Sequence, residues 1–171
     1  MESNQRQISD DGSSLLTLTS TSSTGSRALG AAALITVALG IVYGLIISPP
    51  DAKLGSTVRI IYLHVPTVLA AYLAFIITAV GSAMYLFKKT EFWDLLASSA
   101  AEIGVIFFAV TIIDGALWGK VTWGVFWRWE PRLTTSAVLL LMYIGYLAIR
   151  ALPADPHTRA TRSAIVGLVA V

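Results

Sequence analysis

Residues 60–87 read IIYLHVPTVLAAYLAFIITAVGSAMYLF, a long apolar run that contains no Asp, Glu, Lys or Arg. A bilayer core of about 30 Å is crossed by about 20 helical residues. In lipid, a single segment satisfies its own backbone hydrogen bonds only as a helix. The run therefore predicts a transmembrane helix over residues 58–87.

Three further runs of the same kind predict spanning helices over residues 28–48, 95–117 and 133–150. A fifth apolar run starts at residue 163 and reaches residue 171, and we expect the chain to stop inside this helix. The expected fold class is an all-α, polytopic transmembrane helix bundle over residues 28–171. Residues 1–27 are polar and lack apolar periodicity, which predicts a disordered tail and not a signal peptide.

The composition excludes several classes of protein. Hydrophobic residues make up 56% of the chain and charged residues 13%, against about 25% charged in average soluble domains. The net charge of +2 lacks the clustered Lys and Arg of a nucleic-acid interface, so no nucleic acid is expected as a partner. Because the chain has no Cys, disulfides and thiolate ligands are excluded, and the imidazoles available are those of His64 and His157.

The distribution of basic residues orients the predicted helices. With the N-terminus inside, seven of the 12 Lys and Arg fall in inner segments, as the positive-inside rule requires. We therefore expect a multi-pass protein of the cell (cytoplasmic or inner) membrane, embedded in lipid, with a cytoplasmic N-terminus. The outer segments still hold unusually many basic residues: Lys53, Arg59, Lys120, Arg128 and Arg132.

Four of the five tryptophans fall in residues 117–132, which read LWGKVTWGVFWRWEPR. An aromatic belt explains one or two Trp per helix end, but not four in one connection while residues 48–58 and 150–162 have none. Clustered indoles also form a platform for a flat, apolar ligand such as a porphyrin. We predict an outer haem-binding loop over residues 118–132, with these contacts: Trp118, Gly119, Trp123, Gly124, Phe126, Trp127, Trp129 and Glu130. The two glycines are expected to leave room beside the indoles.

A porphyrin of haem carries two carboxylates on one edge. Arginine binds carboxylates through charge-assisted, often bidentate hydrogen bonds. The basic residues near the loop therefore become candidates for the haem propionates, and they are Arg128, Arg132, Lys120 and Arg59. This role would account for the basic residues on the outer side.

His64 lies near the outer end of the second predicted span, on the same membrane face as the Trp-rich loop. Pro66 perturbs this helical turn, and an ionisable residue at membrane depth is a functional candidate. We predict that His64 is an axial ligand of the haem iron; the alternative is an interfacial histidine bonded to a backbone carbonyl. His157 falls on the opposite face and is predicted to be a solvated loop residue.

Two acidic residues lie in the third predicted span. Glu102 and Asp114 differ by about 120° in azimuth on a helix, so they do not form a pair. Asp114 falls one turn before Trp118, where it could orient the loop, and Glu102 lies deeper, where it could bond a partner helix. For each residue the favoured interpretation is a near-interfacial acid with polar neighbours.

With residues 61–66 (IYLHVP), 114–119 (DGALWG) and 118–136, the sequence resembles the CcmC haem-handling proteins of cytochrome c maturation, the haem exporter protein C family. The resemblance covers residues 41–171, and the family shares a Trp-rich WWD domain. It implies six helices with both termini cytoplasmic, so we expect this chain to be truncated from a longer protein. Glu130 stands where Asp is usual, and Phe126 where many relatives carry Trp.

The resemblance also implies the cargo and its partners. Haem would be b-type, non-covalent and transient, held between His64 and a second axial histidine beyond residue 171. The chain would not be an enzyme; it would present haem to a CcmE-like haem chaperone, together with a CcmA/CcmB-like ABC-transporter pair and a small one-helix CcmD-like subunit. Two alternatives stay open: a CcsA-type cytochrome c synthase subunit, which shares a Trp-rich loop, and a structural or transport subunit without haem.

Overall fold

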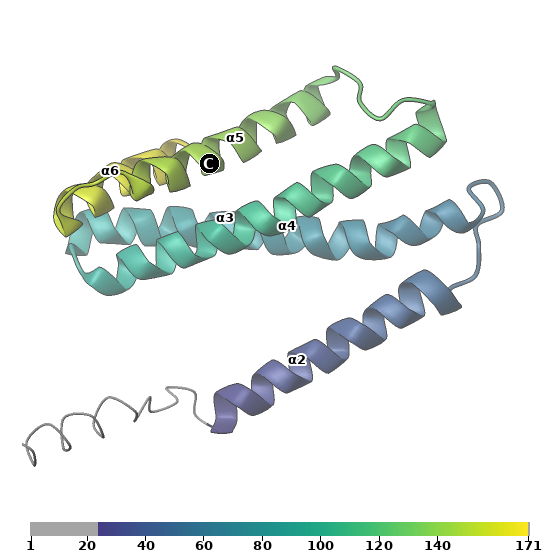
Figure 1. The fold of residues 1–171 in the computed structure, drawn as a ribbon, viewed down its shortest axis with the longest axis horizontal. Coiled ribbons are helices and arrows are strands. Elements are labelled where there is room, and N and C mark those ends of the chain that lie inside the picture. The colour runs from purple at the N-terminus through teal and green to yellow at the C-terminus, as the bar shows by residue number, and fades with distance from the viewer. Residues whose placement is uncertain (1–23, 171) are drawn as a thin grey trace, which may run out of the picture. The chain divides into compact units, whose positions relative to one another are not determined.

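The computed structural model describes residues 24–170, and these residues form helices joined by short connections (Figure 1). Of the predicted tail over residues 1–27, residues 1–23 lie outside the described residues. The first helix begins at Thr24, four residues earlier than predicted. The all-α fold class is confirmed.

The helices follow one another along the chain. Helix α2 covers Thr24–Val42 and continues as the π-helical turn η1, Tyr43–Ile47. A 3-10 turn, η2 (Ser56–Ile60), leads into α3, which is followed by α4, α5 and α6: Ile61–Lys88, Glu91–Trp123, Pro131–Ala151 and Pro156–Val169.

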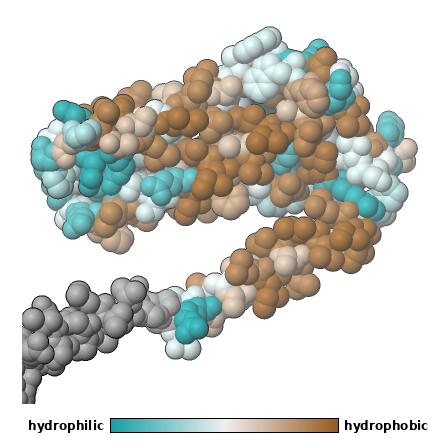
Figure 2. Space-filling view, in the orientation of Figure 1, coloured by the Kyte–Doolittle hydropathy of each residue, from teal (hydrophilic) through white to brown (hydrophobic). Residues whose placement is uncertain are grey.

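Four segments are long and apolar enough to cross a membrane, which confirms the four predicted spans: Thr24–Ile47, Ser56–Lys88, Glu91–Trp123 and Pro131–Ala151. Figure 2 shows hydrophobic side chains over the middle of the body that α3 to α6 form, with hydrophilic residues gathered towards its ends. The chain is a multi-pass membrane protein. The chain divides between Gly40 and Ile41 into two units, and helices α3 to α6 belong to the second.

Helix α4 is longer than predicted. Its 33 residues extend about 50 Å at 1.5 Å per residue, well beyond the about 30 Å of a hydrocarbon core. It ends at Gly124, which has a φ of 79° and whose N–H donates to the Lys120 carbonyl at 3.1 Å. Trp118 and Trp123 therefore stand on α4, and the predicted loop over residues 118–132 is shortened to a connection over residues 124–130.

Helix α6 begins at Pro156, seven residues before the predicted start. Asp155 caps it by accepting a hydrogen bond from the Thr158 N–H at 2.9 Å, and Pro156 is favourable in the first helical turn. The same backbone hydrogen bond lowers the pKa of Asp155. Asp51, in the turn before η2, likewise accepts from the backbone N–H groups of Leu54 and Lys53, which lower its pKa.

Small residues bring the antiparallel helices α3 and α4 together. A Cβ on Gly81 of α3 would lie 3.0 Å from the Cβ of Ala97, and a Cβ on Gly104 of α4 would lie 2.6 Å from the ring of Phe75. Such residues allow close backbone approach between membrane helices. Helix α5 joins this core through Tyr143, whose ring stacks on Phe75 with centroids 3.8 Å apart and whose hydroxyl donates to the Phe75 carbonyl.

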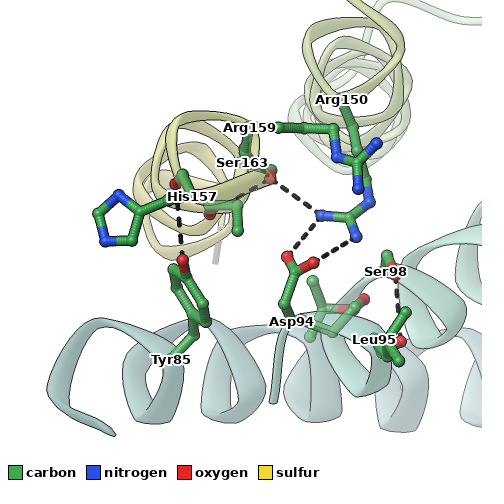
Figure 3. Close-up of polar contacts among 11 residues, drawn as sticks. Tyr85, Asp94, Leu95, Ser98, Arg150, His157, Arg159 and Ser163 are labelled. Carbon is green, nitrogen blue, oxygen red and sulfur yellow. Dashed lines mark hydrogen bonds and ion pairs between the residues drawn. The ribbon is translucent and has the colours of Figure 1, made fainter. Parts of the chain in front are cut away.

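A buried ion pair joins α4 to α5, and a further contact of its guanidinium reaches α6 (Figure 3). Arg150, near the end of α5, donates to both carboxylate oxygens of Asp94 at 2.5 and 2.6 Å. Its Nη1 also lies 3.2 Å from the hydroxyl of Ser163 on α6. Because Asp94 belongs to the first turn of α4 and Arg150 to the last turn of α5, both charges also suit the helix dipoles.

Candidate functional site

A cavity of about 320 Å³ lies between α3, the last turns of α4 and the start of α5. Its volume is at the lower end of the about 300–1,000 Å³ of small-molecule sites. The wall is mainly aromatic and apolar, with a few polar groups that converge from three helices. The rings are those of Tyr72, Phe108, Trp118, Trp123 and Trp127, and the polar groups belong to His64, Thr111, Arg132 and Ser136.

His64 enters this wall from α3, and its imidazole is turned towards α4. The Nδ1 atom lies 2.5 Å from Oδ1 of Asp114, and the imidazole is 37% exposed while the carboxylate is 7% exposed. The hydrogen-bond partner of this histidine is therefore a buried carboxylate and not a backbone carbonyl. The sequence placed Asp114 near the loop but did not predict this contact.

The turn of α3 that carries His64 is tied to α4 by a second contact. Pro66 lies inside the helix and lacks an N–H. The hydroxyl of Thr67 lies within hydrogen-bond distance of the carbonyls of Leu63 and His64, at 2.9 and 3.0 Å, and 3.0 Å from the hydroxyl of Thr111 on α4. The threonine pair and the His64–Asp114 pair are three residues apart on each helix, so they form two neighbouring rungs.

Three of the four clustered tryptophans line the cavity: Trp118, Trp123 and Trp127. Trp118 and Trp123 meet edge to face with centroids 5.6 Å apart. Trp129 and Phe126 do not line it; they are 84% and 55% exposed on the connection. Trp129 instead packs edge to face on Trp127, with centroids 5.8 Å apart.

The two loop glycines have different roles from the common one predicted. A Cβ on Gly119 would lie 3.3 Å from the Trp123 ring, so this glycine does leave room for an indole. A Cβ on Gly124 would meet nothing within 4 Å, and what this position requires is the positive φ that ends α4.

The predicted propionate partners separate into two pairs. Arg132 lines the cavity, and the guanidinium groups of Arg128 and Arg132 lie 5.7 and 5.8 Å from the centroid of the Trp123 ring. Arg132 also pairs with Glu130 at 2.7 Å. The side chains of Arg59 and Lys120 do not line the cavity.

Arg59 and Lys120 instead donate to backbone carbonyls at helix ends. Arg59 donates to the carbonyls of Leu45 and Ser48, and Lys120 donates to that of Gly124 at 2.9 Å. Carbonyls at helix ends lack intrahelical partners, and nearby cationic side chains commonly satisfy them. These two residues stabilise the connections on either side of the site.

Two buried polar atoms next to the cavity have no hydrogen-bond partner among the residues that the structure describes. They are Nε1 of Trp127 and Oδ2 of Asp114. Buried polar atoms are normally paired, so an unpaired donor in the wall of a cavity is suited to a polar group of a bound ligand. Glu102 and His157 lie elsewhere: both are exposed, Glu102 on α4 and His157 in the first turn of α6.

The fold and the site together define a class: a multi-pass helical membrane protein whose aromatic cavity contains one histidine held by a buried carboxylate. A family model described as heme exporter protein C (CcmC) matches residues 13–171. The chain belongs to this family.

Relatives named heme exporter protein C are similar over most of this chain. The chain is 36% identical to that of Rhodobacter capsulatus, over 81% of this chain and 57% of the relative. It is 37% identical to that of Paracoccus denitrificans, over 76% and 54%, and 33% identical to that of Escherichia coli K12, over 71% and 49%. The chain spans about half the length of these curated relatives.

Proposed function

We propose that this protein binds haem in the cavity below the Trp-rich connection and presents it to a haem chaperone for cytochrome c maturation. Membership of the heme exporter protein C family supports a haem-handling role. The observation that carries the proposal is the convergence of one imidazole, three indoles and a guanidinium on one cavity. Haem is cargo in this proposal, and the protein makes and breaks no covalent bonds.

The residues present suit haem better than a bare metal ion. Within residues 24–170, no group of three or more His, Asp or Glu is arranged to hold a metal. A metal bound near His64 would therefore need further ligands, which a porphyrin supplies through its four nitrogens. An axial imidazole is a common protein ligand to haem iron, and the nearby indoles offer the stacking faces that a porphyrin requires.

We assign the iron ligand to Nε2 of His64, because Nδ1 is engaged with Asp114. Trp118, Trp123 and Trp127 would contact the porphyrin, since these are the indoles that line the cavity. Haem would be held non-covalently. The predicted contacts at Trp129 and Phe126 are reassigned to the outer surface of the connection.

The propionates are assigned to a smaller set of residues than the sequence suggested. Arg132 reaches the cavity, Arg128 lies beside it on the ring of Trp123, and the unpaired Nε1 of Trp127 offers a further donor. Charge-assisted hydrogen bonds from guanidinium groups to carboxylates are about twice as strong as neutral ones. Arg59 and Lys120 are left out of this set because their side chains do not line the cavity and donate to backbone carbonyls instead.

Presentation of haem needs a surface that a chaperone can reach. Trp129 and Phe126 are exposed large aromatic residues beside the cavity, and aromatic residues are enriched among those that dominate binding energy at protein interfaces. We assign them to contact with a CcmE-like haem chaperone. A CcmA/CcmB-like transporter pair and a CcmD-like one-helix subunit complete the proposed assembly in the cytoplasmic membrane, with the cavity on the extracytoplasmic side.

Visible spectroscopy of the purified protein tests the proposal. The chain is produced in haem-replete cells, and the Soret absorbance per protein is compared between wild type, His64→Ala and Trp127→Ala. We expect each variant to lose about 2 kcal/mol of binding free energy, or about 30-fold in affinity, as for aromatic and ligand residues at the centre of a site.

The chain offers a matched control for each substitution. His157→Ala removes the other histidine, and Trp93→Ala removes the tryptophan outside the cluster. Both controls should retain haem, because His157 and Trp93 do not line the cavity. Equal Soret absorbance in wild type, His64→Ala and Trp127→Ala would refute the site.

A further inference from the structure

The contact between His64 and Asp114 constrains the protonation of the ring as well as its position. An ionised carboxylate accepts hydrogen bonds and donates none. With Nδ1 of His64 2.5 Å from Oδ1 of Asp114, the proton of a neutral imidazole must sit on Nδ1. The lone pair then sits on Nε2, which is the atom left for a metal ligand.

The surrounding residues hold the ring in this orientation. A Cβ on Gly115 would lie 3.2 Å from Cε1 of His64, so the absence of a side chain at residue 115 allows the imidazole to lie against α4. The threonine pair Thr67–Thr111 fixes the next rung between the helices at 3.0 Å. Helix α4 therefore lies against the Nδ1 and Cε1 atoms of the ring, and His64 also lines the cavity.

Burial of the Asp114 carboxylate strengthens its hydrogen bond with His64. The Asp114 carboxylate is 7% exposed, and its other oxygen has no hydrogen-bond partner among the described residues. In a poorly solvated position a carboxylate gains more from a hydrogen bond than it would in water. His64 provides this bond, and no other side chain of the described chain competes for it.

We propose that Asp114 is a positioning residue, which fixes His64 as the Nδ1–H tautomer and directs its Nε2 to the iron of haem. This inference rests on the proposed function, because it assigns the iron as the ligand of Nε2. Carboxylates in this position orient metal-binding histidines and raise their basicity, and their loss typically lowers metal affinity about 10–100-fold. Asp114 itself does not touch the haem.

The tautomer can be measured without haem. The chain contains two histidines, so ¹⁵N-histidine labelling gives two sets of ring signals, and His157→Gln assigns them. The spectra are recorded on haem-free protein at about pH 8.5, where an ordinary histidine with a pKa of about 6.5 is neutral. We expect His64 to be the Nδ1–H tautomer in wild type and to lose this preference in Asp114→Asn and Asp114→Leu.

A second measurement connects the tautomer to haem. After reconstitution with haem, Asp114→Asn should bind haem about 10–100-fold more weakly, with a higher midpoint potential because a less basic imidazole stabilises ferric iron less. Glu102→Gln is the matched control: it removes another carboxylate of α4, which is exposed and does not line the cavity, and should leave the tautomer and the potential unchanged. Size-exclusion profiles identify any variant that fails to fold, and Asp114→Asn, which has the same shape as wild type, is the variant designed to avoid this.

The outcomes separate this inference from the proposed function. An Nε2–H tautomer in wild type, or a tautomer and a midpoint potential that are the same in wild type, Asp114→Asn and Asp114→Leu, would overturn the role of Asp114. If haem binding still depended on His64 in that case, the proposed function would stand alone. A wild-type protein that binds no haem would overturn both the proposed function and the assignment of iron to Nε2.

Discussion

Replacing Arg150 by Met should destabilise the protein strongly, because it leaves a carboxylate buried without its partner. The guanidinium is 14% exposed and the Asp94 carboxylate 11% exposed, and the two form a bidentate pair. Removing one member of a buried pair costs about 3–5 kcal/mol. The dipole of α4 offsets about 0.3–1 kcal/mol of this cost at Asp94, so we expect a loss of about 3–4 kcal/mol.

A double-mutant cycle isolates the pair from other effects of the substitutions. Asp94→Leu should cost less, about 1–2 kcal/mol, because the long side chain of Arg150 can turn its charge towards water. The double variant Asp94→Leu/Arg150→Met leaves no unpaired charge buried and should also cost about 1–2 kcal/mol. The coupling energy between the two positions is then about 3 kcal/mol.

The free energies can be measured by reversible SDS titration in mixed micelles, followed by far-UV circular dichroism. Arg162→Met serves as the matched control, because Arg162 is exposed on α6 and its loss should change the unfolding free energy by no more than about 0.5 kcal/mol. A coupling energy between Asp94 and Arg150 below about 1 kcal/mol is typical of exposed ion pairs. Such a value would show that this ion pair is solvated and that the reasoning is wrong.

Three further predictions concern topology, the site and pH. In this cysteine-free chain, Ala52→Cys should react with an impermeant maleimide in intact cells and Ala154→Cys only after lysis; labelling in the reverse order would invert the proposed orientation. Gly115→Ala should weaken haem binding about fivefold, because overpacking beside His64 costs about 1 kcal/mol, while Gly145→Ala, which meets no atom within 4 Å, should not. The pKa of Asp155 is lowered from its ordinary 3.8, so its capping contribution should be present above that pH and lost as the pH falls through the lowered pKa. The protection of the amides in the first turn of α6, relative to their intrinsic exchange rate, should fall over the same pH range, and a protection factor that does not change with pH would contradict this.

The four spanning helices could be predicted because hydropathy along a chain is enough to recognise them. The end of α4 could not be placed in this way, since the apolar run stops at residue 117 and the helix continues to Trp123. Nothing in residues 118–123 prevents a helix, and the helix ends where Gly124 adopts a positive φ. A tryptophan cluster after an apolar run therefore does not by itself indicate a loop.

The candidate site was predicted in part. His64 and the tryptophans could be recognised from their residue types, and the structure brings His64, Trp118, Trp123 and Trp127 to one cavity. Arg59 and Lys120 were grouped with the site from their positions in the sequence, but their side chains do not line the cavity, because proximity in sequence does not show which acceptors a cation contacts. Their hydrogen bonds go to helix-end carbonyls, and the positions of these residues beside the ends of η1 and α4 carried that signal.

The partner of His64 was missed for a different reason, which concerns the register of two helices. Asp114 lies 50 residues from His64 in the chain, and their contact exists only because α3 and α4 align as they do. Close contacts of Gly81 with Ala97 and of Gly104 with Ala74 set the register of the two helices. The same register continues to the pair Thr67–Thr111 and then to His64 and Asp114, because each move along α3 is matched by an equal move in the opposite direction along α4. A slip of one residue would rotate Asp114 by about 100° and shift it by about 1.5 Å, which would remove the carboxylate from the ring. The small residues in the middle of the bundle thus determine the orientation of a histidine at its end, and this dependence links a packing motif of the membrane interior to the chemistry of the site.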